Sequence, residues 1–281
     1  MISDLTMHQA KLQSAYEASS LLDTQGRFNP LFVPPGCDVD RFDFAQLMDD
    51  PASCEIQNPE ALRETFLAEQ ALEPFTSSPL DGLTRFIQDE RARELFLEWL
   101  ALINVDLEPW GFGGAFHARP HWVRVLVHAL CVGIACGVDD AGLDALCAAA
   151  AFHDTRRVDP YRDTGHGKRA AEYYAEFCEA TTKPNIFQSE KAHNLLFDSR
   201  TAAIIAWHDC NDDEGMAAIA ASGLPEDTNL LYQIFKDADG LDRIRLCARD
   251  FDASYLRTSA ARKRCEIAQQ MFTFTCQKAP R

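Results

Sequence analysis

An alanine-rich apolar run over residues 143–152 ends in the dipeptide His153-Asp154, and this ending constrains the fold of the chain more than any other feature. A run of this length and composition predicts a buried helix. Burial of an imidazole and a carboxylate at its end costs free energy unless a metal ion or a full set of hydrogen bonds compensates them. The chain therefore has to bring further polar groups to this helix end.

Further residues of metal-ligand type lie on both sides of the dipeptide. His121 lies 32 residues before His153, His166 lies 13 residues after it, His208 a further 42 and Asp239 a further 31. Imidazole nitrogens and carboxylate oxygens are ligands for Zn, Mn, Fe, Ni or Mg, and two adjacent ions can share one carboxylate. The order His, His-Asp, His, His, Asp therefore predicts a buried site for one or two divalent metal ions, with its ligands on different helices.

Four segments of the chain resemble those of the HD superfamily of metal-dependent phosphohydrolases. In order, they are residues 121–125 (HWVRV), 152–154 (FHD), 163–167 (DTGHG) and 236–242 (KDADGLD). The resemblance covers about residues 111–246, roughly half of the chain. It implies an all-α HD-domain helical bundle and metal-dependent hydrolysis of phosphoric ester or anhydride bonds.

The resemblance also implies two groups of ligands. Four residues would hold a primary ion: His121, His153, Asp154 and Asp239. His166 and His208, with Asp154 shared, would hold a second ion or contact the substrate phosphate. A lone histidine on an apolar helix is more often a core residue, and a histidine in a Gly-His-Gly turn is more often exposed, so these assignments depend on the whole ordered set.

Three aspartates compete for the last ligand position. Asp237 and Asp239 would point apart by about 200° on a helix, so both cannot face one ion. The Ala-Asp-x-Leu context of the superfamily favours Asp239. Asp242 is expected to orient a ligand or to pair with Arg243 or Arg245.

His117 lies four residues before His121. Cyclic-nucleotide phosphodiesterases of the superfamily have a His-x-x-x-His pattern, in which the first histidine protonates the leaving oxygen and the second binds metal. The spacing fits, although Ala118 stands where those enzymes have Asn. By this resemblance His117 is a candidate catalytic acid.

Three cations, Arg156, Arg157 and Lys168, flank the predicted site in a chain whose formal net charge is −16. Guanidinium forks match phosphate oxygens, so Arg157 and Lys168 are predicted to hold the phosphate of a substrate. Solvated surface charge is the alternative for all three. The acidic balance argues against a nucleic-acid partner but is compatible with a small phosphorylated substrate.

The chain of 281 residues is long enough to bury a sizeable core. Residues 1–108 predict a helical N-terminal extension, and residues 109–281 predict the HD-type domain. Alternating patterns typical of strands are missing, which favours an all-α fold. With no run of about 18 apolar residues, no basic leader and ten scattered cysteines, we expect a cytoplasmic protein with reduced thiols and no membrane partner.

The predicted function is hydrolysis of a phosphomonoester or phosphodiester bond in a small molecule, with a nucleotide as the first choice. A bound divalent ion would acidify water for attack on phosphorus, with Asp154 among its ligands. Two alternatives stay open. A few HD-fold proteins are diiron oxygenases with the same six ligand types, and a non-catalytic metal-binding regulatory module would keep the site without turnover.

Overall fold

The computed structural model describes residues 78–107, 117, 119–157, 163–181, 187–245 and 251–276. The regular elements within these ranges are all helices, which confirms the all-α class for the described part of the chain. Of the predicted N-terminal extension, residues 1–77 lie outside the described residues. Among the described helices, none is long and apolar enough to cross a membrane.

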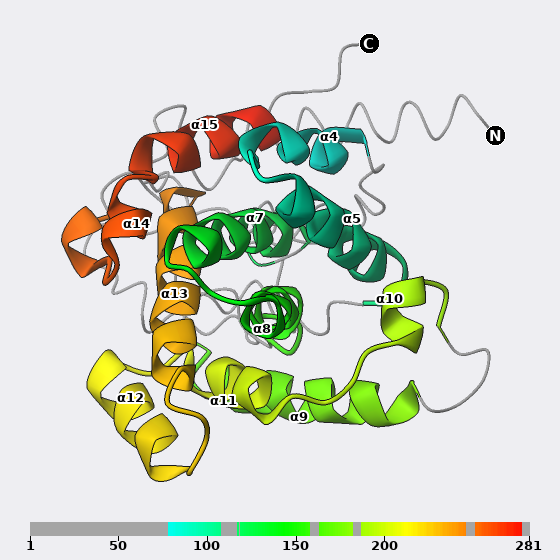
Figure 1. Ribbon diagram of the computed structural model, residues 1–281, viewed down its shortest axis with the longest axis vertical. Coiled ribbons are helices and arrows are strands. Elements are labelled where there is room, and N and C mark those ends of the chain that lie inside the picture. Colours follow the sequence, from blue (N-terminus) through cyan, green and yellow to red (C-terminus); the bar gives the residue numbers. More distant parts are fainter. Residues whose placement is uncertain are drawn as a thin grey trace, which may run out of the picture.

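Figure 1 shows the arrangement of the helices. The label η denotes a 3-10 helix in the text. In chain order, the described elements are α4 (Ser78–Asp81), η3 (Gly82–Phe86), α5 (Glu90–Val105), α7 (Arg119–Ala135), α8 (Asp140–Phe152), α9 (His166–Ala180), α10 (Glu190–His193), α11 (Ser199–Trp207), α12 (Asp212–Ala221), α13 (Thr228–Leu241), η4 (Asp242–Arg245), η5 (Ala253–Tyr255), α14 (Ser259–Arg262) and α15 (Cys265–Cys276).

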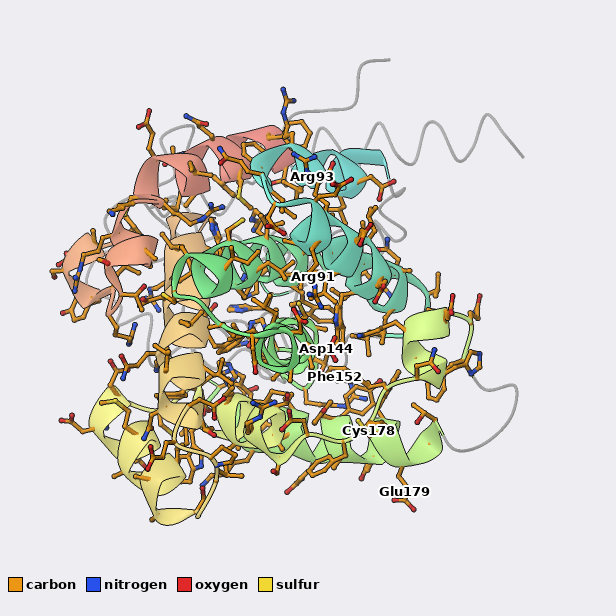
Figure 2. All side chains as sticks on the ribbon, in the orientation of Figure 1. Arg91, Arg93, Asp144, Phe152, Cys178 and Glu179 are labelled. Carbon is orange, nitrogen blue, oxygen red and sulfur yellow. The ribbon has the colours of Figure 1, made fainter. Side chains whose placement is uncertain are left out.

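The centre of the molecule is formed by α7 and α8. Both helices are apolar on nearly every face, which is typical of helices surrounded by others. In Figure 1, α8 is seen almost end-on, and it contacts α5, α7, α9, α11 and α13. Figure 2 shows Phe152, its last residue, near the middle of the ribbon, where the ring packs edge-on against Tyr174 and Phe177 of α9. Polar side chains at the end of α8 are therefore deep in the protein.

Helix α5 packs directly on this centre. Asp89 caps its start by accepting a hydrogen bond from the backbone N–H of Ala92 at 2.9 Å. Phe96 and Trp99 lie on its buried face, and the indole N–H of Trp99 donates to Asp144 of α8 at 3.0 Å. Residues 90–105 thus share one hydrophobic core with the helices that follow.

Helices α8 and α11 end close to the start of α9, and two glycines permit this approach. Gly165 precedes α9 with a φ of +84°, a conformation that favours glycine. A Cβ atom on Gly167 would lie 2.6 Å from the carbonyl oxygen of Ile205 in α11. The Gly-His-Gly sequence therefore presses His166 against the end of α11.

Candidate metal centre

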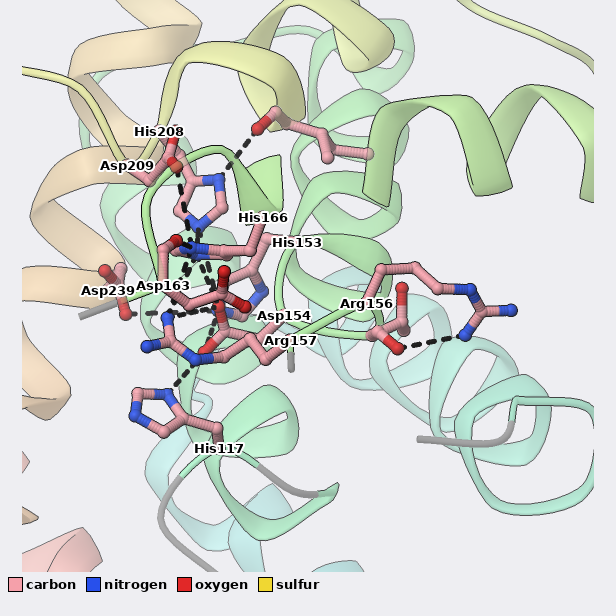
Figure 3. Close-up of polar contacts among 12 residues, drawn as sticks. His117, His153, Asp154, Arg156, Arg157, Asp163, His166, His208, Asp209 and Asp239 are labelled. Carbon is pink, nitrogen blue, oxygen red and sulfur yellow. Dashed lines mark hydrogen bonds and ion pairs between the residues drawn. The ribbon is translucent and has the colours of Figure 1, made fainter. Parts of the chain in front are cut away.

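The side chains of six predicted ligands converge between five helices. His121 comes from α7, His166 opens α9, Asp239 lies on α13, and the other three directly follow α8 or α11. Asp239 is half-buried, with 28% of its side chain exposed, and the other five are buried. Figure 3 shows the labelled members around Asp154: His153, His166, His208 and Asp239.

The first group of ligand atoms surrounds the Nε2 atom of His121. This atom lies 3.0 Å from Nε2 of His153, 3.4 Å from Oδ2 of Asp154 and 3.4 Å from Oδ1 of Asp239. Nε2 of His153 lies 3.7 Å from the same oxygen of Asp154 and 4.0 Å from that of Asp239. The two histidines and Asp239 satisfy the separations expected of ligands that can hold one ion.

The second group uses the other oxygen of Asp154. Its Oδ1 atom lies 3.0 Å from Nε2 of His166 and 3.6 Å from Nε2 of His208. The two imidazole nitrogens are 2.9 Å apart. Asp154 therefore lies between two pairs of histidines and directs one oxygen toward each pair, as a carboxylate shared by two ions would.

Each of the four imidazoles is fixed by a contact at its Nδ1 atom. Nδ1 of His121 lies 2.8 Å from the Asp242 carboxylate. The other three contact backbone carbonyls at 3.0, 2.6 and 2.7 Å; these pairs are His153 with Ala150, His166 with Asp163 and His208 with Ile205. Because a carboxylate or carbonyl oxygen only accepts, each Nδ1 must donate, and the neutral ring then has its lone pair at Nε2.

Lone pairs facing each other at 3.0 and 2.9 Å repel unless a positive charge lies between them. Two ligand nitrogens at about 2.1 Å from one ion and at right angles to each other are about 3.0 Å apart. The separations within both histidine pairs therefore fit a shared metal ion. The buried His and Asp groups can hold a metal, and the donor set suits the divalent ions named above.

Charges within the cluster determine which groups ionise. Burial disfavours ionisation of Asp154, but His153, Arg157 and His117 overcome it and hold the pKa of Asp154 well below its usual value. Burial lowers the pKa of His153 to about 3. Burial also disfavours protonated His208, yet the hydrogen bond and charge of Asp154 raise the pKa of His208 above its ordinary value. His153 and His208 therefore differ in their affinity for protons.

His117 is also brought to the centre. It is buried, and its Nδ1 atom lies 2.6 Å from Oδ2 of Asp154, the oxygen that faces the first group. Its ring packs edge-on against that of His121, with centroids 5.8 Å apart. The spacing of four residues thus places both histidines beside the same carboxylate.

The three predicted cations lie in different surroundings. Arg157 is buried, and its Nη1 atom lies 3.4 Å from Oδ1 of Asp154. Arg156 points away from the cluster in Figure 3, with its guanidinium 3.2 Å from the ring centroid of Tyr173. Lys168 is exposed on α9, where its ammonium lies 4.9 Å from the ring centroid of Trp207. Of the three, Arg157 alone contacts the shared carboxylate.

Sequence reasoning missed several supporting residues. Asp209 accepts a hydrogen bond from the backbone N–H of Gly165 at 2.7 Å and lies 3.5 Å from Nδ1 of His166. The second His-Asp dipeptide was the signal that could have identified it. Asp163 pairs with Arg169 at 2.6 Å while its carbonyl holds His166. These residues fix the start of α9.

Asp242 contacts a ligand, as expected, but its described charged partner is Arg124. The guanidinium of Arg124 donates to both carboxylate oxygens, at 2.6 and 2.9 Å. Asp237 faces away from the centre and accepts a hydrogen bond from the backbone N–H of Thr258 at 2.7 Å. Asp239 is therefore the residue of this segment that reaches the first group.

Comparisons with known proteins returned no match: no family model, no curated protein and no solved structure corresponds to this chain. The resemblance to the HD superfamily therefore stays a prediction, and the geometry of the cluster carries the functional argument.

Proposed function

We propose that the protein is a metal-dependent phosphohydrolase of the HD type that acts on a phosphomonoester or phosphodiester of a small molecule, with a nucleotide as the first choice. The observation that carries the proposal is the position of Asp154, whose two oxygens face two pairs of buried histidines. A carboxylate placed in this way suits a pair of divalent ions. Paired ions are a common device for displacement at phosphorus.

The proposed ligands divide according to the two oxygens of Asp154. His121, His153 and Asp239 would hold the first ion, and His166 and His208 the second. Such ions supply Lewis-acid stabilisation of phosphoryl oxygens and acidify water. The helices around the cluster bury five of the six side chains, and the contacts at Nδ1 keep the imidazoles oriented.

His117 is the proposed proton donor. Its Nδ1–H donates to Asp154, because a carboxylate that ionises this readily only accepts. The same contact stabilises the positively charged form of the ring, which is the form that can release a proton from Nε2 to a leaving oxygen. A phosphate bound near Asp154 would also lie close to Arg157, whose guanidinium can bind phosphate oxygens.

The test is turnover of a panel of nucleotides and sugar phosphates by metal-loaded protein under strictly anaerobic conditions, with Mn²⁺, Fe²⁺, Ni²⁺, Zn²⁺ and Mg²⁺ compared. We expect release of phosphate or of a nucleoside monophosphate. A chelator should stop the release, and added metal should restore it. Asp154→Asn should be inactive, and Asp144→Asn, which alters an aspartate on α8 away from the cluster, should serve as the matched control.

The oxygenase alternative uses the same six ligands, so the presence or absence of O₂ in the assay discriminates between the two activities. Product formation that requires O₂ would favour a diiron oxygenase over the hydrolase. Failure to turn over any phosphorylated compound, with two ions shown to be bound, would favour the regulatory module. Elemental analysis of protein purified without added metal gives the ion and its stoichiometry independently of any substrate.

A further inference from the structure

Arg157 occupies an unusual place for a positively charged side chain. It is 5% exposed, and its Nη1 atom lies 3.1 Å from Nε2 of His166 and 3.4 Å from Oδ1 of Asp154. Figure 3 shows its guanidinium beside Asp154. A guanidinium thus contacts two of the three atoms that would bind the second ion.

The charge of Arg157 disfavours an ion at these atoms. Nδ1 of His166 lies 2.6 Å from the carbonyl oxygen of Asp163 and must donate to it. A neutral imidazole then has one lone pair, at Nε2. Nη1 of Arg157 lies 3.1 Å from Nε2 and 3.4 Å from Nδ1 of His166, so the guanidinium lies over the face of the ring, next to an ion that would bind this lone pair. At this place the positive charge of Arg157 repels a cation.

The first group differs in this respect. Arg124 contacts Asp242 behind His121 and therefore lies on the Nδ1 side of the ring. Its guanidinium does not contact the ligand atoms of the first ion. Within the described residues, competition between a side-chain cation and an ion is therefore confined to the group of His166 and His208.

We propose that Arg157 is an internal cation that competes with the second ion and transfers to the substrate phosphate when that ion binds. The transfer rests on the proposed hydrolase function, whereas the competition does not. When the ion binds to His166 and Asp154, its charge displaces the guanidinium from these atoms toward a phosphate. Phosphate binding in turn removes the competitor, so phosphate and the second ion strengthen each other's binding reciprocally.

Calorimetric titration of chelator-stripped protein with Mn²⁺ alone tests the competition. We expect wild-type protein to bind a first ion tightly and a second ion more weakly. Arg157→Gln should bind the second ion at least about tenfold more tightly, because both the repulsion and the contact at His166 are removed. Arg157→Lys retains the charge and should stay closer to wild type. Arg156→Gln, altered at the neighbouring arginine that stacks on Tyr173, is the matched control and should titrate like wild type.

Inorganic phosphate in the same titration tests the transfer. In wild-type protein it should tighten the second ion by about five- to tenfold, within the usual range of coupling between sites. In Arg157→Gln this effect should disappear. Tighter binding in Arg157→Gln without any effect of phosphate on wild type would overturn the transfer and leave the competition standing.

Equal or weaker binding of the second ion by Arg157→Gln would overturn the competition, provided that thermal unfolding shows the metal-free variant to be folded. If Arg157→Gln does not fold, Arg157→Lys and Arg157→Met decide. The first variant keeps the charge and the second removes it, so equally tight second-ion binding by both would contradict a role for charge. Turnover is not needed for these readouts, so they are independent of whether the hydrolase proposal fails.

Discussion

The same dipeptide follows α8 and α11, and this makes their ends an internal comparison. His153-Asp154 follows α8, and His208-Asp209 follows α11. In both, the imidazole donates from Nδ1 to the carbonyl three residues earlier, at 3.0 and 2.7 Å. Both rings therefore direct Nε2 into the centre. Up to the histidine, the two helix ends are built alike.

The aspartates differ. Asp154 lies among the histidines and is shared by both groups of ligands, whereas Asp209 turns to α9 and accepts a hydrogen bond from the N–H of Gly165. The surroundings decide the difference, since α7 and α13 bring ligands to the end of α8 and α9 begins against the end of α11. The same dipeptide thus supplies a ligand at one helix end and a support at the other.

Removal of the shared charge should have the largest effect. We expect Asp154→Asn to lose both ions. The loss of metal affinity should exceed the roughly 100-fold loss that removal of a supporting residue causes. Loss of the ions also removes their stabilisation, about 2.7 kcal/mol for an ion at 100 times its Kd. Elemental analysis after dialysis and thermal unfolding with and without chelator measure both effects. Retention of two ions by this variant would show that Asp154 is not the shared ligand.

The same change at the second dipeptide should be milder and selective. Asp209→Asn keeps a side-chain oxygen for Gly165 but removes the charge beside His166. We expect the second ion to bind about 10- to 100-fold more weakly, as is typical when a supporting residue is lost, with the first ion unaffected. Titration of the metal-free variant with Mn²⁺ measures this. Equal weakening at both sites would mean that Asp209 supports the whole cluster and not one group.

Much of this comparison was open to prediction from the sequence. The order and spacing of the histidines and aspartates predicted the six side chains that converge, and the 200° separation of Asp237 and Asp239 on a helix predicted that only one of them reaches the centre. Both are local properties of the chain. The all-α class followed in the same way, from apolar periodicity within single segments.

What the sequence could not show depends on contacts between distant segments. Arg156 and Arg157 are neighbours, yet one stacks on Tyr173 and the other contacts Asp154. Lys168, predicted to hold phosphate, lies over Trp207. The direction of each cation is set by how α9 packs beside the end of α8, and no pattern in one chain encodes that packing.

A smaller effect should come from the contact between α9 and α11. Gly167→Ala places a Cβ atom 2.6 Å from the Ile205 carbonyl and 3.0 Å from Nδ1 of His208, so the helices must separate. We expect a loss of about 1–3 kcal/mol in the free energy of unfolding, measured by urea denaturation of metal-free protein. Gly240→Ala, whose Cβ would make an ordinary 3.5 Å contact with Leu256, is the control and should be neutral or stabilising. Equal stability of the two variants would contradict the close approach.

The finest distinction between the two helix ends concerns protons. Burial lowers the pKa of His153 to about 3, so near neutral pH no proton on this histidine competes with an ion. Burial opposes protonation of His208 as well, but Asp154 outweighs it and raises the pKa of His208 above its ordinary value. Below this raised pKa a proton must leave His208 before an ion binds. The affinity of the second ion should therefore fall by up to about tenfold for each further pH unit.

On this basis the ions should leave in sequence as the pH falls from about 7.5 to about 5.5, with the ion of His166 and His208 lost first. Elemental analysis of protein dialysed at each pH gives the occupancy. The variant His208→Gln shows which ion is lost first, because it should retain one ion whose occupancy changes little over this pH range. Two ions lost together from wild type, or an equally pH-sensitive single ion in His208→Gln, would mean that the two histidines do not differ in their affinity for protons.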